Sequence, residues 1–299
     1  MPLSDTMEPA ARQTPGPTSP DGADHGSVAH AATRRDKRNG TGRRELEERL
    51  GTERPARPLL SIVFPVLNES KNLPHVLPRL PKDCELILVD GHSLDETVAV
   101  AHELRPDLTL VVQNRTGKGN ALVCGFNACQ GDVILMMDAD GSMAPEEIDR
   151  FIQGLVAGAD LVKGSRFIKG GGSSDITRMR RAGNRILNGL VNIIYRQRFT
   201  DLCYGYMAFW RDVLPCFGLT VGNADDGYRW GDGFEIEAFL NVRASMCGLT
   251  IVEIPSYEHE RIHGASNLRA FSDGMRVLRT ISRERFQRRS ALGPQRRTA

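Results

Sequence analysis

Short apolar segments alternate with helical patterns through the middle of this chain, from about Leu59 to Gly164. The apolar segments are rich in Val, Ile and Leu, which favours strands. They are Leu59–Val66, Glu85–Asp90, Leu108–Gln113, Asp132–Asp138 and Asp160–Gly164. The helical patterns between them cover about Asn72–Leu80, Asp95–Leu104, Asn120–Ala128 and Pro145–Ala157. Regular alternation of this kind predicts an α/β fold with a mostly parallel sheet and helices on both faces.

The fourth of these strands ends in two carboxylates, Asp138 and Asp140, separated only by Ala139. The carboxyl ends of parallel strands form the edge at which open α/β sheets bind ligands. Two carboxylates this close repel each other unless a cation lies between them. Hard oxygen ligands favour Mg²⁺ or Mn²⁺, which proteins commonly hold together with substrate phosphates. An isolated Asp-x-Asp also occurs where Asp merely caps the next helix, so the metal hypothesis needs support from other residues.

Three earlier strand ends provide that support. The first strand runs through Pro65 into Asn68 and Glu69, the second ends at Asp90, and a Gly-Lys-Gly segment around Lys118 follows the third. Successive parallel strands end at the same edge of a sheet, so we expect these loops to form one pocket. A pocket with acids, a metal pair and a cation suits a nucleotide that bears a diphosphate.

Two common nucleotide-binding motifs are absent from the sequence. The Gly-Lys-Gly segment is not a P-loop, because Val112 stands where the first Gly is required and no Ser or Thr follows Lys118. No G-x-G-x-x-G follows the first strand, which argues against a dinucleotide-binding domain.

The alternation stops after Gly164. A Gly-rich loop at 170–174 is typical of a mobile segment, and we expect it to act as a lid. A helix is predicted from about Ile176 to Tyr195, with apolar residues on one face and arginines at both ends. Packing on the sheet and lying on a membrane surface explain this pattern about equally well. The C-terminal segment 276–299 is rich in Arg, which suits either a solvated helix or anionic headgroups.

The two ends of the chain differ from its middle. Residues 1–57 are rich in Pro, Gly, Ser, Asp and Arg, which predicts a disordered basic arm. The folded α/β domain is expected at 58–287, with interface helices at its end, and a basic tail is expected at 288–299. The arm has no continuous apolar stretch of the kind found in secretory signals, and no window is apolar enough to span a bilayer.

Charge and cysteine content indicate where such a protein works. The net charge of +2 makes nucleic acid an unexpected partner. The six cysteines form no C-x-x-C pair and several lie in apolar periodic segments, as expected of reduced, mostly buried thiols. We therefore expect a cytoplasmic protein that can associate peripherally with the inner, anionic face of the plasma membrane.

Taken together, these motifs resemble glycosyltransferase family 2 enzymes with a GT-A fold, a Rossmann-like fold of nucleotide-diphospho-sugar transferases. Within the family, the chain looks most like the dolichol-phosphate mannosyltransferase and polyprenyl-phosphate hexosyltransferase branch. The similarity covers about Leu60 to Leu278. It implies an inverting, Mg²⁺- or Mn²⁺-dependent enzyme that moves a hexose from a nucleotide sugar of the GDP-mannose or UDP-glucose type to a polyprenyl phosphate at the membrane surface.

The resemblance also implies roles for individual residues. On the donor side, the matching positions are Pro65, Asn68, Glu69, Asp90, Lys118, Asp138, Ala139, Asp140 and Arg166. Among these, Glu69 would lie near the base or ribose, Asp138 and Asp140 would hold the metal, and Arg166 would meet the diphosphate or the acceptor. Asp201 with Gly205 matches a later turn. Glu253-Ile254-Pro255, Arg261, Gly264 and Ser266 match the segment near the acceptor phosphate.

Three positions depart from the family pattern. His92 stands in a strand end that usually reads Asp-Asp-Gly-Ser, so one nucleotide contact is in doubt. Ser142 stands where a Gln often adds a metal ligand, and Asn267 follows Ser266 where a Lys is usual. The last two changes weaken the assignment of a lipid-phosphate acceptor and leave the fold untouched.

The chemistry that the resemblance implies rests on positioning and charge. The metal would neutralise the leaving nucleoside diphosphate, and Arg166 and Arg261 would donate to phosphate oxygens. A phosphate acceptor is already ionised, whereas a hydroxyl acceptor would need a base. Asp232 and Glu235 are available for that alternative, although both could equally hold a loop or pair with arginines. A sugar-1-phosphate nucleotidyltransferase or a non-catalytic binding module is favoured least, because the first lacks its Gly-rich loop and the second leaves the metal pair unexplained.

Overall fold

The computed structural model of the 299-residue chain describes residues 30–31, 54–264 and 270–291. Its centre is a sheet in the order β1-β9-β6-β8-β5-β2-β3-β4. The strands are β1 (His30–Ala31), β2 (Leu60–Val66), β3 (Glu85–Asp90), β4 (Thr109–Val112), β5 (Val133–Met136), β6 (Leu161–Ser165), β8 (Met207–Trp210) and β9 (Ile251–Pro255). A separate pair joins β7 (Gly172–Ser173) to β10 (Tyr257–Glu258).

The predicted mostly parallel sheet is confirmed, with one strand placed differently. Strands β5, β2, β3 and β4 pair in parallel, as do β6 and β9. However, β8 inserts between β5 and β6 and runs antiparallel to both. A strand from the later part of the chain therefore separates β5 from β6.

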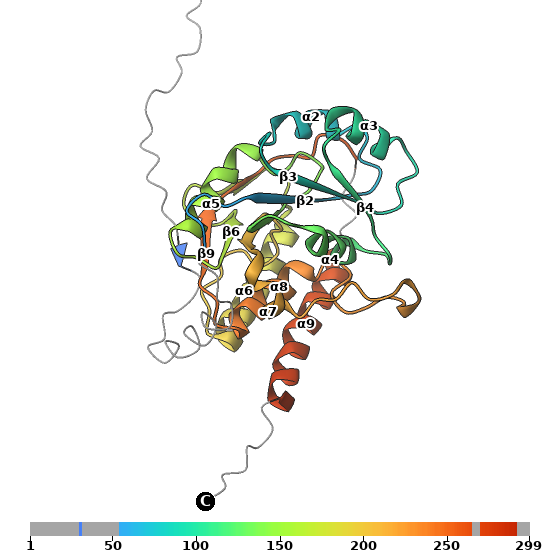
Figure 1. The fold of residues 1–299 in the computed structure, drawn as a ribbon. Helices are drawn as coiled ribbons and strands as arrows, with labels where there is room; N and C mark the ends of the chain where they lie inside the picture. Colours follow the sequence, from blue (N-terminus) through green and yellow to red (C-terminus); the bar gives the residue numbers. More distant parts are fainter. Residues whose placement is uncertain (1–29, 32–53, 265–269, 292–299) are drawn as a thin grey trace, which may run out of the picture.

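Helices cover both faces of the sheet (Figure 1). They are α2 (Leu73–Val76), α3 (Thr97–Leu104), α4 (Lys118–Ala128), α5 (Ile148–Val156), α6 (Arg178–Tyr195), α7 (Leu214–Phe217), α8 (Ile236–Met246) and α9 (Ala270–Ala291). Short 3-10 turns lie at Leu77–Arg79, Pro145–Glu147, Arg211–Val213 and Ala224–Asp226. In Figure 1, α2 and α3 lie above the sheet, and α4, α6, α8 and α9 lie below it. The lower helices α6, α8 and α9 pack against one another.

The core lies between these layers and is built from the strands. Strands β2, β3 and β5 bury nearly all their side chains, as expected for parallel strands covered on both faces. Helix α4 approaches the sheet closely at Gly125, where a Cβ would lie 2.4 Å from Cγ1 of Val63. This close approach sets the position of Lys118 at the start of the helix.

The Gly-rich loop at 170–174 is not the free lid that its composition suggested. Gly172 and Ser173 form β7 and pair with β10. The Ser173 hydroxyl donates to Glu258, and the Ser174 amide donates to the Glu258 carbonyl at 2.9 Å. The loop is fixed because β10 satisfies its backbone groups.

The predicted boundaries at the two ends stay predictions, because the structure describes only parts of both ends. Where the arm is described, His30–Ala31 pairs antiparallel with β9, and Arg54 binds Asp160 and Asp212. The remainder of the predicted arm lies outside the described residues. Helix α9 continues to Ala291, past the boundary expected at 287, and the rest of the tail also lies outside them.

The cysteines at 84, 124 and 129 are buried, those at 203 and 216 are partly exposed, Cys247 is exposed, and all six are free thiols.

Candidate active site

Asp138 and Asp140 lie in the loop that follows β5, at the carboxyl edge of the parallel strands. The Asp138 side chain is 30% exposed, whereas that of Asp140 is 6% exposed. Asp140 Oδ1 accepts the Ser142 amide at 2.9 Å, which tightens the turn. Gly141 has a φ of +82°, and its lack of a side chain leaves room for Ile262. A Cβ at Gly141 would lie 2.5 Å from Cδ1 of Ile262. The sequence thus places both acids at the predicted edge.

Each of these carboxylates is paired with a cation of the protein. Lys118 Nζ lies 2.7 Å from Asp138 Oδ1, and Arg261 Nη2 lies 2.8 Å from Asp140 Oδ2. Lys118 also lies 2.9 Å from Glu237 Oε1 on α8. Burial alone would lower the pKa of Lys118, but Asp138 and Glu237 more than offset it and raise the pKa. Lys118 therefore remains charged throughout the physiological range.

The residues at this edge fit a hard divalent cation. Two carboxylates supply only part of a coordination shell, and in the described ranges no group of three Asp, Glu, His or Cys side chains could hold a metal. Mg²⁺ and Mn²⁺ sites of this kind take their remaining oxygens from substrate phosphates and water. The buried Nε of Arg261 has no hydrogen-bond acceptor among the described residues, so a donor for a phosphate oxygen is already present. This donor set agrees with a metal held jointly with a diphosphate.

The donor-side loops meet next to this pair. Glu69 Oε2 accepts from Asn72, and burial raises the Glu69 pKa, reinforced by the nearby Asp140 and only partly offset by Asn72. Asn72 also accepts the His263 amide at 2.9 Å, so it links the Glu69 loop to the segment that carries Arg261. Asn72 was missed by sequence reasoning, because only its buried position distinguishes it from an ordinary helix-capping Asn.

Asp90, Asn68 and Pro65 shape the neighbouring loop. Asp90 accepts the backbone amides of His92 and Ser93, and Asn68, at a φ of +58°, accepts the Leu94 amide at 2.8 Å. Pro65 lies within β2 opposite Val89, one residue before the strand ends at Val66. Ala139 is buried between the two acids. The loops after β2 and β3 therefore lie together, and the roles predicted for these residues stay predictions.

Arg166 follows β6 and is locked by protein carboxylates. Its Nε lies 2.7 Å from Asp201 Oδ2, its Nη1 lies 3.0 Å from Glu258 Oε1, and its guanidinium stacks on Tyr204 at 4.7 Å. Burial would lower its pKa, but Asp201 and Glu258 raise it well above the ordinary value. Arg166 lines the cavity described next, although its main contacts are with the protein.

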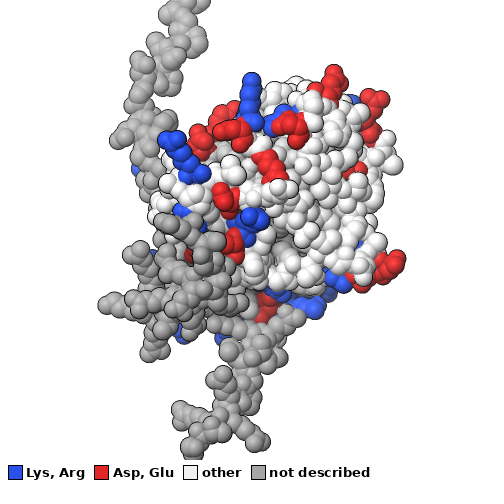
Figure 2. All heavy atoms as spheres, in the orientation of Figure 1, with Lys and Arg blue, Asp and Glu red and all other residues white. Residues whose placement is uncertain are grey.

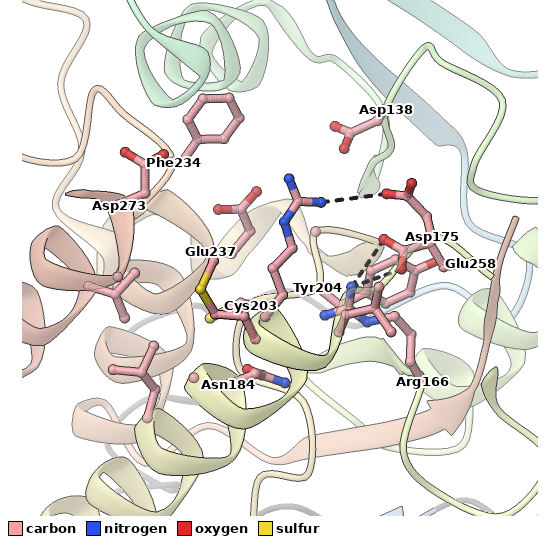
Figure 3. Close-up of a pocket in the computed structure, with 18 of the residues that line it drawn as sticks. Asp138, Arg166, Asp175, Asn184, Cys203, Tyr204, Phe234, Glu237, Glu258 and Asp273 are labelled. Carbon is pink, nitrogen blue, oxygen red and sulfur yellow. Dashed lines mark hydrogen bonds and ion pairs between the residues drawn. The ribbon is translucent and has the colours of Figure 1, made fainter. Parts of the chain in front are cut away.

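A cavity of about 350 Å³ opens beside these residues (Figure 3). In Figure 3, Asp138 enters from the loop after β5 and Glu237 from α8, while Arg166 and Glu258 lie together on another side. Its charged lining includes Lys118, Asp138, Arg166, Asp175, Arg180, Glu237, Glu258, Arg261 and Asp273. Its apolar lining includes Met143, Ile176, Met179, Leu187, Phe234, Phe271 and Val277, mostly from α6 and α9. One cavity therefore combines charged and apolar lining residues.

The structure does not support Asp232 as a catalytic base. Both of its carboxylate oxygens accept from Arg115, at 2.9 and 2.8 Å, and its side chain is 4% exposed. Asp232 is not among the residues that line the cavity. Glu235 is also buried and accepts from Tyr228 and Gly231. Both acids hold the segment before α8. The acid that reaches the site is Glu237, two residues after Glu235. The local sequence could not distinguish Glu237 from these neighbouring acids.

Arg261 reaches the site as predicted, through its ion pair with Asp140. The backbone of its loop is fixed to the metal-pair loop, because the Ile262 amide donates to the Asp140 carbonyl at 3.0 Å. Ser266, and with it Asn267, lies outside the described residues. Their predicted role at the acceptor phosphate stays a prediction.

Comparison with known proteins agrees with this geometry. The family model for glycosyl transferase family 2 matches residues 61–218. Polyprenol monophosphomannose synthase of Mycolicibacterium smegmatis is 34% identical over 73% of this chain and 83% of its own. An undecaprenyl-phosphate 4-deoxy-4-formamido-L-arabinose transferase of Pseudomonas fluorescens is 30% identical, over 69% of this chain and 59% of its own.

Solved structures with the same fold include glucosyl-3-phosphoglycerate synthase from Mycobacterium tuberculosis in complex with Mn²⁺, uridine diphosphate and glucosyl-3-phosphoglycerate. It superposes with a TM-score of 0.58 at 20% identity, over 81% of this chain and 82% of that one. At this identity the likeness establishes the GT-A fold alone. Fold, strand-end carboxylates and family model agree, and the chain belongs to glycosyltransferase family 2.

Proposed function

We propose that this protein transfers a hexose from a nucleotide-diphosphate sugar to a polyprenyl phosphate, with inversion at the sugar carbon and with Mg²⁺ or Mn²⁺ at Asp138 and Asp140. The observation that carries the proposal is the cavity that Asp138 lines together with apolar side chains of α6 and α9. The named activities of the relatives in Mycolicibacterium and Pseudomonas, both directed at polyprenyl phosphates, support the same acceptor class.

The two regions of the cavity suit the two parts of such an acceptor. Lys118, Arg180 and Arg261 line the charged region and can donate to phosphate oxygens. Ile176, Leu187, Phe271 and Val277 line the apolar region, where an isoprenoid chain would leave water. A water-soluble hydroxyl acceptor would gain nothing from this apolar surface.

The protein's own residues supply most of the chemistry. A bound divalent cation would neutralise charge on the leaving nucleoside diphosphate. Lys118, held by Glu237, and Arg261, with its free Nε, place two fixed cations beside the carboxylate pair. Asn72 holds the Arg261 loop against the Glu69 loop, so donor and acceptor contacts are positioned together. A phosphate acceptor is already ionised near neutral pH, so it requires no catalytic base. This agrees with Asp232, whose carboxylate is bound by Arg115 and is not free to act as a base.

The outer surface of α6 supports contact with a membrane. Met179, Ile186 and Ile193 recur every seven residues and are 67%, 65% and 79% exposed. Arg178, Arg181 and Arg185 lie beside them and are also exposed. In Figure 2, acidic and basic side chains are interspersed over the upper part of the face shown, and basic ones also lie at its lower edge. Within the described ranges, no helix has the length and apolarity needed to cross a bilayer. We therefore propose peripheral docking through α6 on an anionic surface.

The proposal is tested by nucleotide release from GDP-mannose and UDP-glucose, with Mn²⁺ or Mg²⁺, in the presence and absence of a polyprenyl phosphate. We expect release to depend on both the metal and the lipid phosphate. Asp138→Asn should lower the rate on the order of 10²–10⁴-fold, about 3–5 kcal/mol of transition-state stabilisation. The matched control is Asp149→Asn, an exposed acid on α5. Full activity in EDTA would refute the metal, and transfer to a hydroxyl compound alone would refute the acceptor.

A further inference from the structure

The glycines of the Gly-Lys-Gly segment around Lys118 make room for another part of the chain. Gly117 has a φ of +111°, and a Cβ there would lie 2.2 Å from the Asp232 carbonyl oxygen. A Cβ at Gly119 would lie 1.8 Å from the Gly231 carbonyl oxygen. Both positions therefore require glycine, because the backbone of Gly231 and Asp232 packs directly on them.

The same contact uses backbone amides at the start of α4. The Asp232 carbonyl accepts the Gly119 amide at 2.8 Å and the Asn120 amide at 3.2 Å. In a phosphate-binding loop, amides at this place point at the anion. Here they are bound to the protein backbone, so the two glycines serve packing. What the segment offers to a ligand is the side chain of Lys118, which lines the cavity of the active site.

A buried ion pair holds Asp232 against α4. Arg115 donates to both carboxylate oxygens of Asp232, at 2.9 and 2.8 Å, and the Arg229 amide donates to Oδ2 at 2.7 Å. The side chains of Arg115 and Asp232 are only 3% and 4% exposed. Arg115 also donates to the Val221 carbonyl. The bidentate geometry of the pair fixes the orientation of the two segments as well as their distance.

The two segments joined by this pair meet again in the active site. Arg115 lies three residues before Lys118, which begins α4. Asp232 lies five residues before Glu237, in the first turn of α8. Lys118 Nζ lies 2.9 Å from Glu237 Oε1 and 2.7 Å from Asp138 Oδ1. A lysine side chain is flexible, so its ammonium group stays in one place only if its backbone and its counter-charge are both fixed.

We propose that Arg115 and Asp232 are positioning residues for the transfer reaction and that they act through Lys118. The pair binds the segment before α8 to the start of α4 and so sets the distance between Lys118 and Glu237. Lys118 then presents a fixed positive charge beside Asp138, where charge would develop on the leaving diphosphate. A charge fixed in advance needs no reorganisation during the reaction. The use of this charge rests on the proposed function, whereas its position does not.

The position of Lys118 can be measured in EDTA, without donor or acceptor. Acetic anhydride modifies neutral, accessible amines, and mass spectrometry reads the extent at each lysine. Lys118 should react slowly in the parent chain, because burial lowers its pKa less than Asp138 and Glu237 raise it, and because its side chain is 14% exposed. Asp232→Asn should raise the modification rate about tenfold, since a displaced Lys118 regains water and loses Glu237. Arg115→Lys, which keeps the charge, should have a smaller effect.

Lys163 and Glu284 provide the controls. Lys163 is fully buried and reports on the whole fold, so it should stay unmodified in every variant. Glu284→Gln breaks another buried pair, in which Arg243 donates to both carboxylate oxygens at 2.9 and 3.1 Å, and it should leave Lys118 slow. Unchanged labelling of Lys118 in Asp232→Asn overturns the proposal. Equal increases at Lys118 and Lys163 also overturn it, because the pair would then hold the whole domain and not the lysine.

The effect on the reaction is tested by a double-mutant cycle with nucleotide release. Asp232→Asn should lower kcat/KM for the nucleotide sugar about tenfold in the parent chain, mainly through kcat. In Lys118→Met it should lower kcat/KM by less than about twofold, because the residue through which it acts is gone. A purely structural role would give the same factor in both backgrounds and would overturn the proposal. If no chain releases nucleotide from a sugar donor, the proposed function fails, while the labelling still decides whether the pair positions Lys118.

Discussion

Lys118 forms ion pairs with two acids of the site at once. It lies between Asp138 and Glu237, at 2.7 and 2.9 Å, and is the cation nearest to the exposed member of the acid pair. Burial raises the pKa of Glu237, although Lys118 counteracts this effect. When Asp138 takes a metal, Glu237 still provides a buried counter-charge for Lys118. Glu237 is in this sense a positioning residue, and it keeps the ammonium group at the site.

Asp201 is a second residue whose charge matters, and it makes a pH-dependent contribution to stability. Burial would raise its pKa, but Arg166 more than offsets this effect and holds the pKa below the ordinary 3.8. A lowered folded-state pKa stabilises the protein above the unfolded-state pKa, and the contribution is lost as the pH falls through the lower folded-state value. Asp201→Asn should therefore cost about 3–5 kcal/mol near neutral pH, because Arg166 loses a buried partner.

The measurement is the free energy of unfolding in urea at pH 7, 5, 3 and 2. The difference between the parent chain and Asp201→Asn should be largest at pH 7 and should shrink only below about the ordinary Asp pKa. Asp149→Asn serves as the exposed control, with little effect at any pH. A difference that stayed constant down to pH 2 would show that the charge of Asp201 does not matter.

At the scale of elements, the fit of α4 against the sheet determines the position of Lys118. A Cβ at Gly125 would lie 2.4 Å from Val63 Cγ1 and 2.8 Å from Val89 Cγ2, inside a buried contact. Gly125→Ala should destabilise the fold by about 1–3 kcal/mol through overpacking. The helix would also be pushed from the sheet, so metal affinity should weaken.

Gly189→Ala on α6 is the matched control, because nothing lies within 4 Å of a Cβ at that position. It should be neutral or stabilising by about 0.5–1 kcal/mol, since Ala is the better helix former. Urea unfolding of both variants distinguishes steric overpacking from helix propensity. A stabilised Gly125→Ala would contradict the close approach of α4.

The exposed apolar stripe of α6 makes a prediction of its own. Replacing Ile193 with Ser removes a side chain that is 79% exposed, so stability should change by no more than about 0.5 kcal/mol. Binding to anionic vesicles should nevertheless weaken severalfold, because the buried apolar area at the membrane is reduced. Co-sedimentation with vesicles provides the measurement. Val156→Ser on α5, another exposed apolar position, should bind as the parent chain does.

At the scale of the whole molecule, the sequence predicted those features that local patterns determine. The strands β2 to β5, their helices and the acids at their ends follow from periodicity and from the rule for parallel strand ends. The insertion of β8, the β7–β10 pair and the role of Glu237 depend on contacts between distant segments. Asp232 was misassigned for the same reason, because its partner Arg115 lies 117 residues away. Composition made 170–174 look mobile, whereas a backbone partner from β10 fixes it.

The N-terminal boundary gives the last prediction. Arg54 Nη1 lies 2.7 Å from Asp160 Oδ1, and its Nε lies 3.0 Å from Asp212 Oδ2, with the guanidinium over Trp210 at 5.1 Å. It joins the residue before β6 to the turn after β8, so we predict that Arg54 contributes to the folded domain that composition placed from residue 58. Removing residues 1–53 should lower stability by only about 1 kcal/mol or less, the value of a two-residue strand contact, and turnover should stay the same.

Arg54→Ala in the shortened chain should then lower the free energy of unfolding by a further amount of about 1–3 kcal/mol, because two partly buried carboxylates lose their partner. The measurements are thermal unfolding and nucleotide release. They compare three chains: the full-length protein, residues 54–299, and residues 54–299 with Arg54→Ala. If the first deletion alone destabilised the domain strongly, the pairing of His30–Ala31 with β9 would carry more of the fold than its two residues suggest. If Arg54→Ala had no effect, the domain boundary would return to the position that composition predicts.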